Sequence, residues 1–209
     1  EFLVGSEKRF AEYISKLNEK DKIAIISHSR DIDGIVSAKV VDSIIDANLI
    51  KFVDYDELNN NLLNELNKNN INKVIMTDLS IGDISFIKKL EEFSSILIID
   101  HHIFQEDLNS EKTTFMNSRD YCASYISYCL FSKIKNLEKI DWLVALASVS
   151  DWLYEKNRRW IEEVYNKYGD KLLLEGIFVK KEGKMWDLLT NIYNSIMYFN
   201  KDVKKVFDS

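Results

Sequence analysis

The sequence contains no proline, only two cysteines and only three histidines in 209 residues. The missing proline, beside abundant lysine, asparagine and isoleucine, indicates an AT-rich coding sequence rather than a chemical requirement. Cys122 and Cys129 lie seven residues apart in an apolar stretch that is predicted to be helical. Residues two turns apart on a straight helix are beyond disulfide reach, so we expect two buried free thiols.

Long apolar runs are also missing, and none approaches the roughly 18 to 20 residues that a membrane-spanning helix needs. The N-terminus has no basic segment followed by an apolar one, so we expect no secretory leader of the usual pattern. We therefore expect a cytoplasmic protein that does not enter a membrane. The chain begins at Glu1 rather than at a methionine, which is compatible with a processed or excised piece of a longer protein.

Positive charge is in the minority, with 28 Lys and Arg against 34 Asp and Glu and a net charge of −6. This balance excludes a protein coated in positive charge, although a local basic channel stays open. With 46% hydrophobic and 30% charged residues, the chain resembles soluble globular proteins and can bury a core. No repeat, low-complexity tract or Gly/Ser linker is visible, so we expect one large domain with at most a small appendage.

Short apolar runs alternate with stretches of helical periodicity in the first 117 residues. Such runs are typical of strands buried on both faces of a sheet. The alternation predicts an α/β fold, a doubly wound and mostly parallel sheet with helices on both faces. The predicted strands are 22–27, 51–55, 73–77 and 95–99, and the predicted helices are 7–17, 34–46, 57–67 and 84–93.

Beyond Asn117 the pattern changes to helices alone. The predicted helices there are 121–135, 140–150, 160–168 and 186–207. We therefore expect the sheet to be followed by an all-helical C-terminal part. The loose stretch at 152–159 is the predicted boundary, which divides the chain into a sheet domain, 1–152, and a helical C-terminal extension, 153–209.

Ionisable side chains gather where the predicted strands end. In a doubly wound sheet the carboxyl ends of the strands form the ligand-binding edge, so we expect these groups to converge. Imidazole and carboxylate suit Mn²⁺ or Mg²⁺ better than a metal that prefers thiolates. Gly34 allows a close backbone approach where the next helix starts. The set, which includes every histidine of the chain, is His28, Asp31, Asp33, Asp78, Asp100, His101, His102 and, at the end of helix 140–150, Asp151.

Four or five carboxylates packed at one edge would repel one another and raise one another's pKa values unless divalent cations neutralised them. Two such ions can share a water, lower its pKa and hold the attacking and leaving oxygens in line at phosphorus. The pattern therefore predicts hydrolysis of a phosphoester or phosphoanhydride by a two-metal mechanism without a covalent enzyme intermediate.

These residues stand in the order of the motifs of one known family, and over residues 22–152 the sequence resembles the DHH phosphoesterase superfamily. Asp100-His101-His102 is the triplet that gives the superfamily its name. Its members include RecJ-type single-strand exonucleases, oligoribonucleases, cyclic-dinucleotide phosphodiesterases and family II inorganic pyrophosphatases. Many of them space the first His and Asp of the first motif differently from His28 and Asp31. The resemblance implies that 1–152 is the catalytic domain.

The resemblance also implies a metal-binding role for six residues. The two sites would bind Mn²⁺ by preference, with Mg²⁺ as the alternative. Asp78 would bridge them. The first ion would be held by His28, Asp31 and Asp78, and the second by Asp33, Asp78, His101 and Asp151.

Three further residues receive roles beside the metals. Asp100 would accept the ring N–H of His101 and fix the orientation of that imidazole. His102 would face the substrate phosphate and stabilise the charge that develops on its oxygens. Arg119, just after the next predicted strand, would bind phosphate through both arms of its guanidinium, although a solvated loop arginine explains it equally well.

Most members of the superfamily carry a second domain with a glycine- and histidine-containing motif, and the sequence shows no such motif. No histidine follows His102, and the glycines after Asp151 are isolated. The helical extension is mildly basic and contains Trp160, Trp186 and Tyr193. Such a mixture suits single-stranded nucleic acid, but a solvated helix face over an aromatic core gives the same pattern.

Three functions are compatible with these motifs. The favoured one is a Mn²⁺-dependent RecJ-like exonuclease on single-stranded DNA or RNA, acting in repair or replication with a helicase or a replication or repair protein. The second is a phosphoesterase for an oligonucleotide, a cyclic dinucleotide or pyrophosphate, although closed pockets for small substrates normally need the second domain as a lid. The third is a non-catalytic RecJ-like replisome scaffold, and the complete set of metal ligands argues against it.

Overall fold

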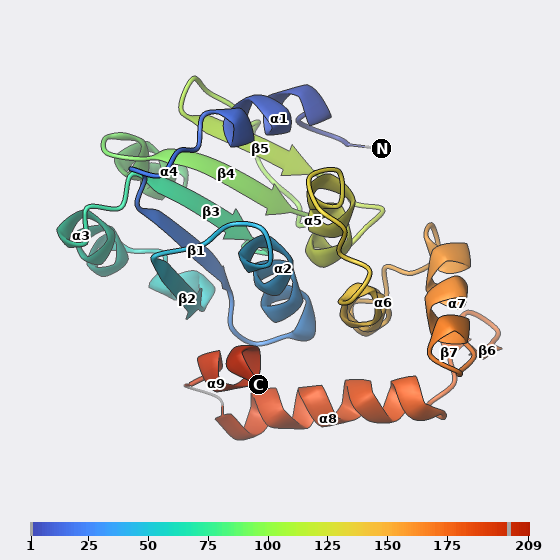
Figure 1. Ribbon diagram of the computed structural model, residues 1–209. Coiled ribbons are helices and arrows are strands. Elements are labelled where there is room, and N and C mark those ends of the chain that lie inside the picture. The colour runs from blue at the N-terminus through green and yellow to red at the C-terminus, as the bar shows by residue number, and fades with distance from the viewer. Residues whose placement is uncertain (1, 200–201) are drawn as a thin grey trace.

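The computed structural model describes residues 2–199 and 202–209 (Figure 1). Five parallel strands form one sheet in the order β2-β1-β3-β4-β5. These strands are β1 (Ile23–His28), β2 (Leu49–Val53), β3 (Lys73–Thr77), β4 (Ser95–Asp100) and β5 (Thr113–Asn117). The helices along the sheet are α1 (Glu7–Ser15), α2 (Ile32–Asp42), the short 3-10 helix η1 (Tyr55–Glu57), α3 (Asn60–Lys68), α4 (Ile84–Glu91), α5 (Ala123–Phe131) and α6 (Asp141–Ser150). The C-terminal elements are α7 (Arg158–Lys167), β6 (Leu174–Glu175), β7 (Phe178–Val179), α8 (Lys184–Phe199) and α9 (Lys204–Asp208).

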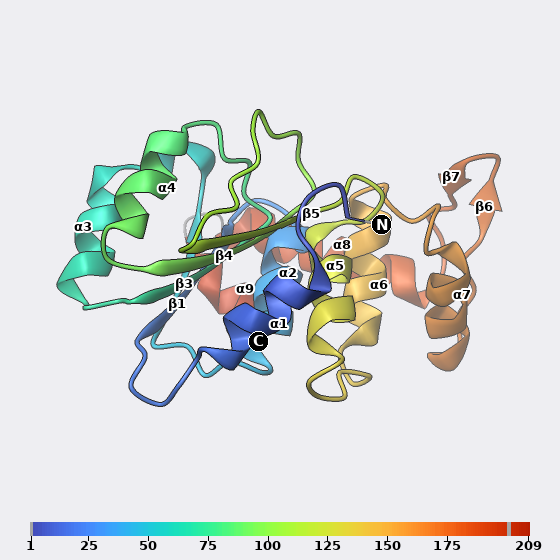
Figure 2. The same cartoon turned by 90° about the horizontal axis from the view of Figure 1, so that it is seen from above.

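Side chains of the central strands alternate between two cores, one on each face of the sheet. In β1, Ile25 joins the core that includes α1, α2, α5 and α6, whereas Ala24 and Ile26 join the core of α3 and α4. Strands β3 and β4 alternate in the same way. Figure 2 shows α3 and α4 on one side of the sheet and α1, α2 and α5 on the other. The doubly wound α/β fold expected from the sequence is therefore confirmed.

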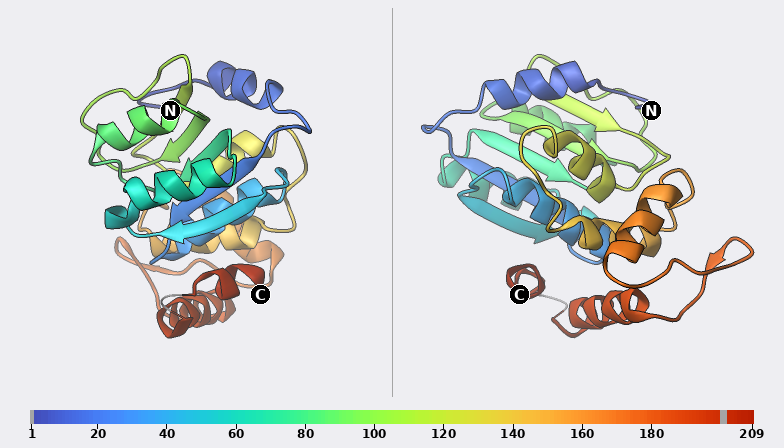
Figure 3. Two further views of the ribbon diagram at one scale, coloured as in Figure 1. Left: turned by 90° about the vertical axis from the view of Figure 1, so that its left-hand side faces the viewer. Right: turned by 45° about the vertical axis from the view of Figure 1, so that its right-hand side comes forward.

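The C-terminal helices pack against this sheet domain. α8 contacts α2 and α6, and it lies beyond them as seen from the sheet (Figure 3). Leu189 and Ile196 of α8 and Phe207 of α9 belong to the same buried core as α2. Phe207 also lies 5.4 Å from the ring of Phe52. The division into a sheet domain, 1–152, and a C-terminal extension, 153–209, stays a prediction.

The C-terminal part differs from the expectation of helices alone in two details. The helix predicted at 186–207 is divided into α8 and α9, and residues 200–201 between them lie outside the described part of the chain. A two-stranded antiparallel hairpin, β6 with β7, lies between α7 and α8. Gly176 takes φ +64°, which suits the first position of its two-residue turn. Strands of two residues have no alternation that a sequence pattern could reveal.

The two cysteines differ in exposure. Cys122 is buried as expected, whereas Cys129 is exposed, which corrects the expectation for the second thiol. Cys122 is the N-cap of α5 with extended backbone angles, whereas Cys129 lies within the helix. Within residues 2–199 and 202–209, no helix has the length and apolar character for crossing a membrane.

Candidate metal centre

Four segments of the chain meet at the carboxyl edge of the sheet. His28 is the last residue of β1, Asp78 follows β3 directly, and Asp100 is the last residue of β4. The three strands pair in register, so these residues end their strands at the same level. Helix α2 starts at this edge with Asp31 as its N-cap, and Asp151 is the C-cap of α6. The predicted convergence of the motifs is thus present.

The first group of potential ligands comprises His28, Asp31 and Asp78. The Nδ1 atom of His28 lies 2.7 Å from Oδ2 of Asp31 and 3.9 Å from Oδ2 of Asp78. The other oxygen of Asp31 accepts the backbone N–H of Gly34 at 2.8 Å, which caps α2 and fixes the carboxylate. The unusual spacing of His28 and Asp31 therefore still brings both side chains to one point.

The second group comprises Asp33, His101 and Asp151. The Nε2 atom of His101 lies 3.3 Å from Oδ2 of Asp151 and 3.8 Å from Oδ2 of Asp33. The same nitrogen lies 3.1 Å from Oδ1 of Asp78. Asp78 thus presents Oδ1 to the second group and Oδ2 to the first, as a bridging carboxylate would.

The backbone at Asp78 is held in an uncommon conformation. Its φ is +55°, in the left-handed region, which aspartate tolerates better than most residues. Its amide donates to the carbonyl of Ile99 at 3.0 Å, so the residue is tied to the neighbouring strand β4. This geometry turns the side chain into the space between the two groups of ligands.

Asp33 is fixed by the N-terminus of another helix. Its two carboxylate oxygens accept the backbone N–H groups of Ala123 and Ser124 at 2.8 and 2.9 Å. These amides are at the start of α5, where the helix dipole favours negative charge. Each oxygen keeps a free lone pair, so Asp33 can cap α5 and still bind an ion.

The contact between β1 and α2 explains the glycine of the first motif. A Cβ atom at Gly34 would lie 2.4 Å from the backbone oxygen of His28. Hydrogen bonds of hydroxyl groups also join these elements. The hydroxyl of Ser27 donates to the carbonyl of Gly34 at 2.6 Å, and that of Ser37 donates to the hydroxyl oxygen of Thr77 at 2.9 Å. These contacts fix the distance between the histidine at the end of β1 and the aspartates at the start of α2.

Asp100 orients a different histidine from the one predicted. Its Oδ1 atom lies 2.7 Å from Nδ1 of His102, whereas the prediction was a hydrogen bond with His101. Strand β4 ends at Asp100, and the bend that follows brings His102 rather than His101 to this carboxylate. Burial lowers the pKa of His102, but the hydrogen bond and the charge of Asp100 outweigh it, so the net shift is upward. Asp100 therefore favours the protonated form of the half-buried His102.

The acidic groups strongly perturb one another. Burial raises the pKa of Asp78 well above its usual range, and the charges of Asp33 and Asp31 raise it further. Burial and the same two neighbours raise the pKa of Asp151 to about 8. Burial acts to raise the pKa of Asp31 as well, but the hydrogen bond to His28, the charge of that ring and the amide of Gly34 together lower it. Bound cations would reduce the repulsion between these carboxylates, which is one cause of the raised pKa values.

Two carboxylate oxygens of the centre are buried without a hydrogen-bond partner among the described residues. They are Oδ2 of Asp78 and Oδ2 of Asp151. Buried polar atoms are normally satisfied, and leaving one unpaired costs about 1 to 3 kcal/mol. One divalent ion in each group would satisfy them, because Oδ2 of Asp78 faces the first group and Oδ2 of Asp151 the second, and the surrounding oxygen and imidazole donors suit Mn²⁺ or Mg²⁺. The residues present therefore fit the predicted pair of ions.

Sequence patterns missed three residues beside the first group, Arg30, Asp54 and Tyr55. The guanidinium of Arg30 donates to Asp54 at 2.6 and 2.7 Å, and this hydrogen bond lowers the pKa of that carboxyl. Oδ1 of Asp54 lies 3.8 Å from Nε2 of His28, the ring nitrogen that faces away from Asp31. This distance is too long for a hydrogen bond, so Asp54 acts on the His28 ring through its charge.

Arg119 is exposed in the loop after β5. Among residues 2–199 and 202–209, no hydrogen bond or ion pair joins it to the two groups of ligands. Nearby, the side chain of Asn117 donates to the carbonyl of His102 at 3.0 Å and supports the loop that carries both histidines. The predicted contact between Arg119 and phosphate thus stays a prediction.

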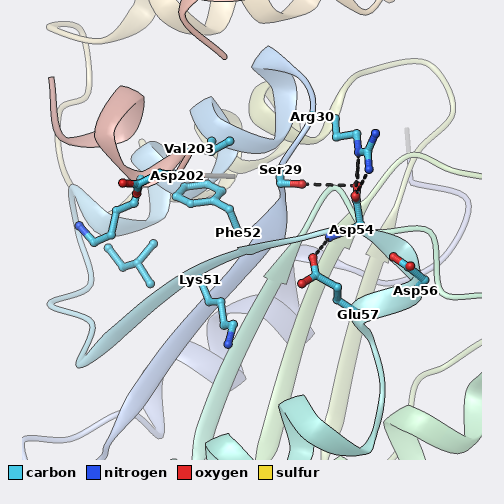
Figure 4. Close-up of a pocket in the computed structure, with 11 residues that line it drawn as sticks. Ser29, Arg30, Lys51, Phe52, Asp54, Asp56, Glu57, Asp202 and Val203 are labelled. Carbon is cyan, nitrogen blue, oxygen red and sulfur yellow. Dashed lines mark hydrogen bonds and ion pairs between the residues drawn. The ribbon is translucent and has the colours of Figure 1, made fainter. Parts of the chain in front are cut away.

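A cavity of about 630 Å³ opens beside the first group (Figure 4). It lies between the edge strand β2 and the start of α9. Its lining includes Arg30, Lys51 and Asp54, together with Asp202 and Val203. None of the six predicted ligands lines it, so it is a neighbour of the metal centre and not its mouth.

Solved structures share this fold. RecJ in complex with Mn²⁺ from Thermus thermophilus matches with a TM-score of 0.69 and 13% identity, over 97% of this chain and 34% of that one. A second structure, exonuclease RecJ bound to manganese, matches with a TM-score of 0.61 and 13% identity, over 98% of this chain and 55% of that one. CDC45 from Entamoeba histolytica matches with a TM-score of 0.58 and 16% identity, over 78% of this chain and 37% of that one.

At such low identities the likeness shows the fold alone. The chain spans about a third of the length of the Thermus protein and about half of the second RecJ. A search among curated protein sequences finds no match. A profile of the DHH family, N-terminal domain, matches residues 22–149, which is more than half of the chain and includes all of the candidate ligands except Asp151. The predicted family is therefore confirmed: the chain belongs to the DHH family and has a RecJ-like fold.

Proposed function

We propose that this protein is a Mn²⁺-dependent phosphodiesterase, a RecJ-like exonuclease that hydrolyses single-stranded DNA or RNA. One observation carries the proposal. The buried carboxylate of Asp78 presents one oxygen to each group of potential ligands, and one of these oxygens has no hydrogen-bond partner among the described residues. A structural aspartate would satisfy both oxygens, so this arrangement supports a shared ligand of two ions.

In this proposal the first ion is held by His28, Asp31 and Asp78. The second ion is held by Asp33, Asp78, His101 and Asp151. When bound, the ions would supply an activated water and stabilise charge on the phosphorus oxygens. The protein holds the ligands in place through the α5 amides on Asp33, the α2 cap on Asp31 and the β4 contact at Asp78. Such preorganisation limits the rearrangement that the reaction would need.

His102 is the proposed contact to the substrate phosphate. Asp100 accepts its Nδ1–H, so Nε2 is the ring nitrogen that does not face this carboxylate. When the ring is protonated, Nε2 carries a hydrogen and can donate it to a phosphate oxygen. Arg119 is kept as a second candidate for phosphate contact.

Exposed aromatic side chains beside the second group favour a nucleic-acid substrate over pyrophosphate. Trp152 follows Asp151 directly and is 59% exposed, and its ring lies 5.8 Å from that of Phe178, which is 56% exposed. Aromatic rings on a surface can stack on bases of any sequence. Trp160 contributes less, because it packs against Tyr125 and Tyr128.

The proposal extends to a cytoplasmic role in DNA repair or replication. A helicase or a replication or repair protein remains the candidate partner. The alternatives are a phosphoesterase for an oligonucleotide, cyclic dinucleotide or pyrophosphate, and a non-catalytic scaffold.

A substrate panel tests the proposal. Protein freed of metal by a chelator is supplied with Mn²⁺ and given end-labelled single strands of DNA and RNA, a dinucleotide, a cyclic dinucleotide and pyrophosphate. We expect stepwise shortening of a strand from one end. Preferential cleavage of a small substrate would support the second function instead. Binding of Mn²⁺ without hydrolysis of any substrate would overturn the proposal in favour of the scaffold.

The panel is sharpened by a variant that leaves the metal ligands intact. We expect Trp152→Ala to raise the KM for single strands about tenfold, since stacking of one base is worth about 1 to 3 kcal/mol. Hydrolysis of the dinucleotide should change less. Equal KM values for the variant and the wild-type protein would exclude Trp152 as a base platform.

A further inference from the structure

Tyr55 lies between two histidines that come from different strands. It is the first residue of η1, just beyond β2, whereas His28 ends β1 and His102 follows β4. Its ring stacks on the ring of His28 with a centroid distance of 4.6 Å and an interplanar angle of 11°. Its hydroxyl lies 3.2 Å from Nε2 of His102. The side chain of Tyr55 thus contacts both His28, a candidate ligand of the first ion, and His102, the residue proposed to bind the substrate phosphate.

The backbone that carries Tyr55 is fixed on both sides. The amide of Asp54 donates to Oε2 of Glu57 at 2.7 Å, which closes the turn of η1. The carboxylate of Asp54 is held by Arg30. Tyr55 itself is 43% exposed, so burial in the core does not explain its position. The turn holds the phenol against the two imidazoles.

With Tyr55 in place, each imidazole is constrained by several contacts. His28 has Asp31 at Nδ1, Asp54 3.8 Å from Nε2 and the phenol ring on its face. His102 has Asp100 at Nδ1 and the phenol hydroxyl at Nε2. Partners of this kind orient ligating and catalytic histidines, and removing one typically costs about 10- to 100-fold in metal affinity or activity.

We propose that Tyr55 is a positioning residue of the metal centre with two separable parts. Its ring holds the plane of His28 for the first ion. Its hydroxyl holds Nε2 of His102 at the place where a substrate phosphate oxygen would take over the hydrogen bond. The inference rests on the proposed function, because it assigns the hydroxyl to the same phosphodiester hydrolysis.

Two substitutions separate the ring from the hydroxyl. Tyr55→Phe keeps the stacking and removes the hydroxyl, and Tyr55→Leu removes both. Tyr198 provides matched controls, because it is 83% exposed on α8 and its ring packs against Phe199 and not against a candidate ligand. Tyr198→Phe and Tyr198→Leu should match the wild-type protein in metal affinity and activity. Thermal unfolding followed by circular dichroism shows that each variant is folded.

Mn²⁺ affinity is measured by isothermal titration of the metal alone into the metal-free protein. We expect Tyr55→Leu to lose about 10- to 100-fold in affinity, and Tyr55→Phe to stay within about twofold of the wild-type protein. On single strands, Tyr55→Phe should lower kcat about tenfold with little change in KM. The rescue of metal affinity by phenylalanine is the result that a merely structural tyrosine would not give.

Several results would overturn the inference. One is wild-type Mn²⁺ affinity in Tyr55→Leu, and another is equal loss of affinity in both variants. A higher KM with unchanged affinity would make Tyr55 a contact for the substrate base instead. If Tyr55→Leu does not fold, wild-type kcat in Tyr55→Phe overturns the inference by itself. Failure of the proposed function looks different: the wild-type protein would bind Mn²⁺ and cleave no phosphodiester, while the titrations would still decide the role of the ring.

Discussion

At the carboxyl edge of the sheet, acidic side chains lie next to one another. In the C-terminal helices, acidic side chains pair with lysine and arginine side chains. The acidic neighbours of Asp78 are Asp33, Asp31, Asp100 and Asp151. In α7, by contrast, Arg159 pairs with Glu163 four residues later. Arg158 with Glu162 and Lys204 with Asp208 repeat this spacing.

The difference separates two uses of charge. Exposed pairs four residues apart neutralise each other locally and contribute a few tenths of a kcal/mol. A buried acidic cluster destabilises the fold until cations neutralise it, so it is maintained at a cost in stability. The comparison therefore predicts large, metal-dependent effects at the edge of the sheet and small ones in the C-terminal helices.

The largest effect is expected for Asp78→Asn. The variant removes the charge between the two groups but keeps the shape of the side chain. Losing several kcal/mol of charge stabilisation should lower kcat on single strands by about 1,000-fold or more. Because the variant also removes repulsion, the metal-free protein should be at least as stable to urea as the wild-type protein. Retained activity in the variant would refute the bridging role.

The next largest effect is the change with pH in the free energy of unfolding of the metal-free protein. The pKa of Asp151 is raised to about 8 and that of Asp78 is also raised, whereas both are near 4 in the unfolded chain. The folded state therefore holds extra protons between about pH 4 and pH 8, and the free energy of unfolding should fall as pH rises through this window.

Urea unfolding at pH 5 and pH 8 measures this trend. At pH 8, Mn²⁺ at about 100 times its Kd should restore about 2.7 kcal/mol, which corresponds to a rise in Tm of roughly 5 to 10 °C. In the Asp78→Asn variant, the free energy of unfolding should fall less as pH rises and should increase less when Mn²⁺ is added. A metal-free wild-type protein that gains stability from pH 5 to pH 8 would contradict the assigned pKa shifts.

A smaller effect is expected for Gly34→Ala. The added Cβ would lie 2.4 Å from the backbone oxygen of His28, so β1 and α2 must move apart. Overpacking of this kind costs about 1 to 3 kcal/mol, measured as a lower midpoint of urea unfolding. Gly82→Ala is the matched control, because nothing lies within 4 Å of a Cβ at that position. Equal unfolding midpoints for the two variants would show that the contact between β1 and α2 is not tight.

The smallest effect is expected in the C-terminal helices. Arg159→Ala removes an exposed pair whose atoms Nε and Oε1 lie 3.1 Å apart. The free energy of unfolding should change by less than about 0.5 kcal/mol, and kcat should not change. A loss of activity in this variant would mean that α7 contributes to the site, which would weaken the contrast between the two regions.

The sequence predicted the central strands well and the edge strand less well. The prediction 73–77 coincides with β3, since a strand buried on both faces is a continuous apolar run. The second strand was predicted at 51–55 but ends at Val53. As an edge strand it is only half-buried, so its pattern is weaker. This shift of two residues placed Asp54 and Tyr55 inside a strand and hid them as residues of the site.

The candidate site was predictable in composition but not in pairing. The predicted strand ends indicated that His28, Asp78 and Asp100 would lie close together, because the carboxyl ends of parallel strands form one edge of the sheet. Which of two adjacent histidines Asp100 contacts depends on backbone direction, and the sequence alone did not settle it. The contact of Tyr55 with His102 joins residues 47 positions apart, and no local pattern encodes such a contact.

The most direct test of the central claim is the anomalous scattering of manganese in crystals of the protein grown with Mn²⁺. Two peaks should flank the carboxylate of Asp78, one in contact with His28 and Asp31 and the other with His101 and Asp151. A map without peaks there, or with a single peak that Asp78 does not contact, would contradict the two-metal account.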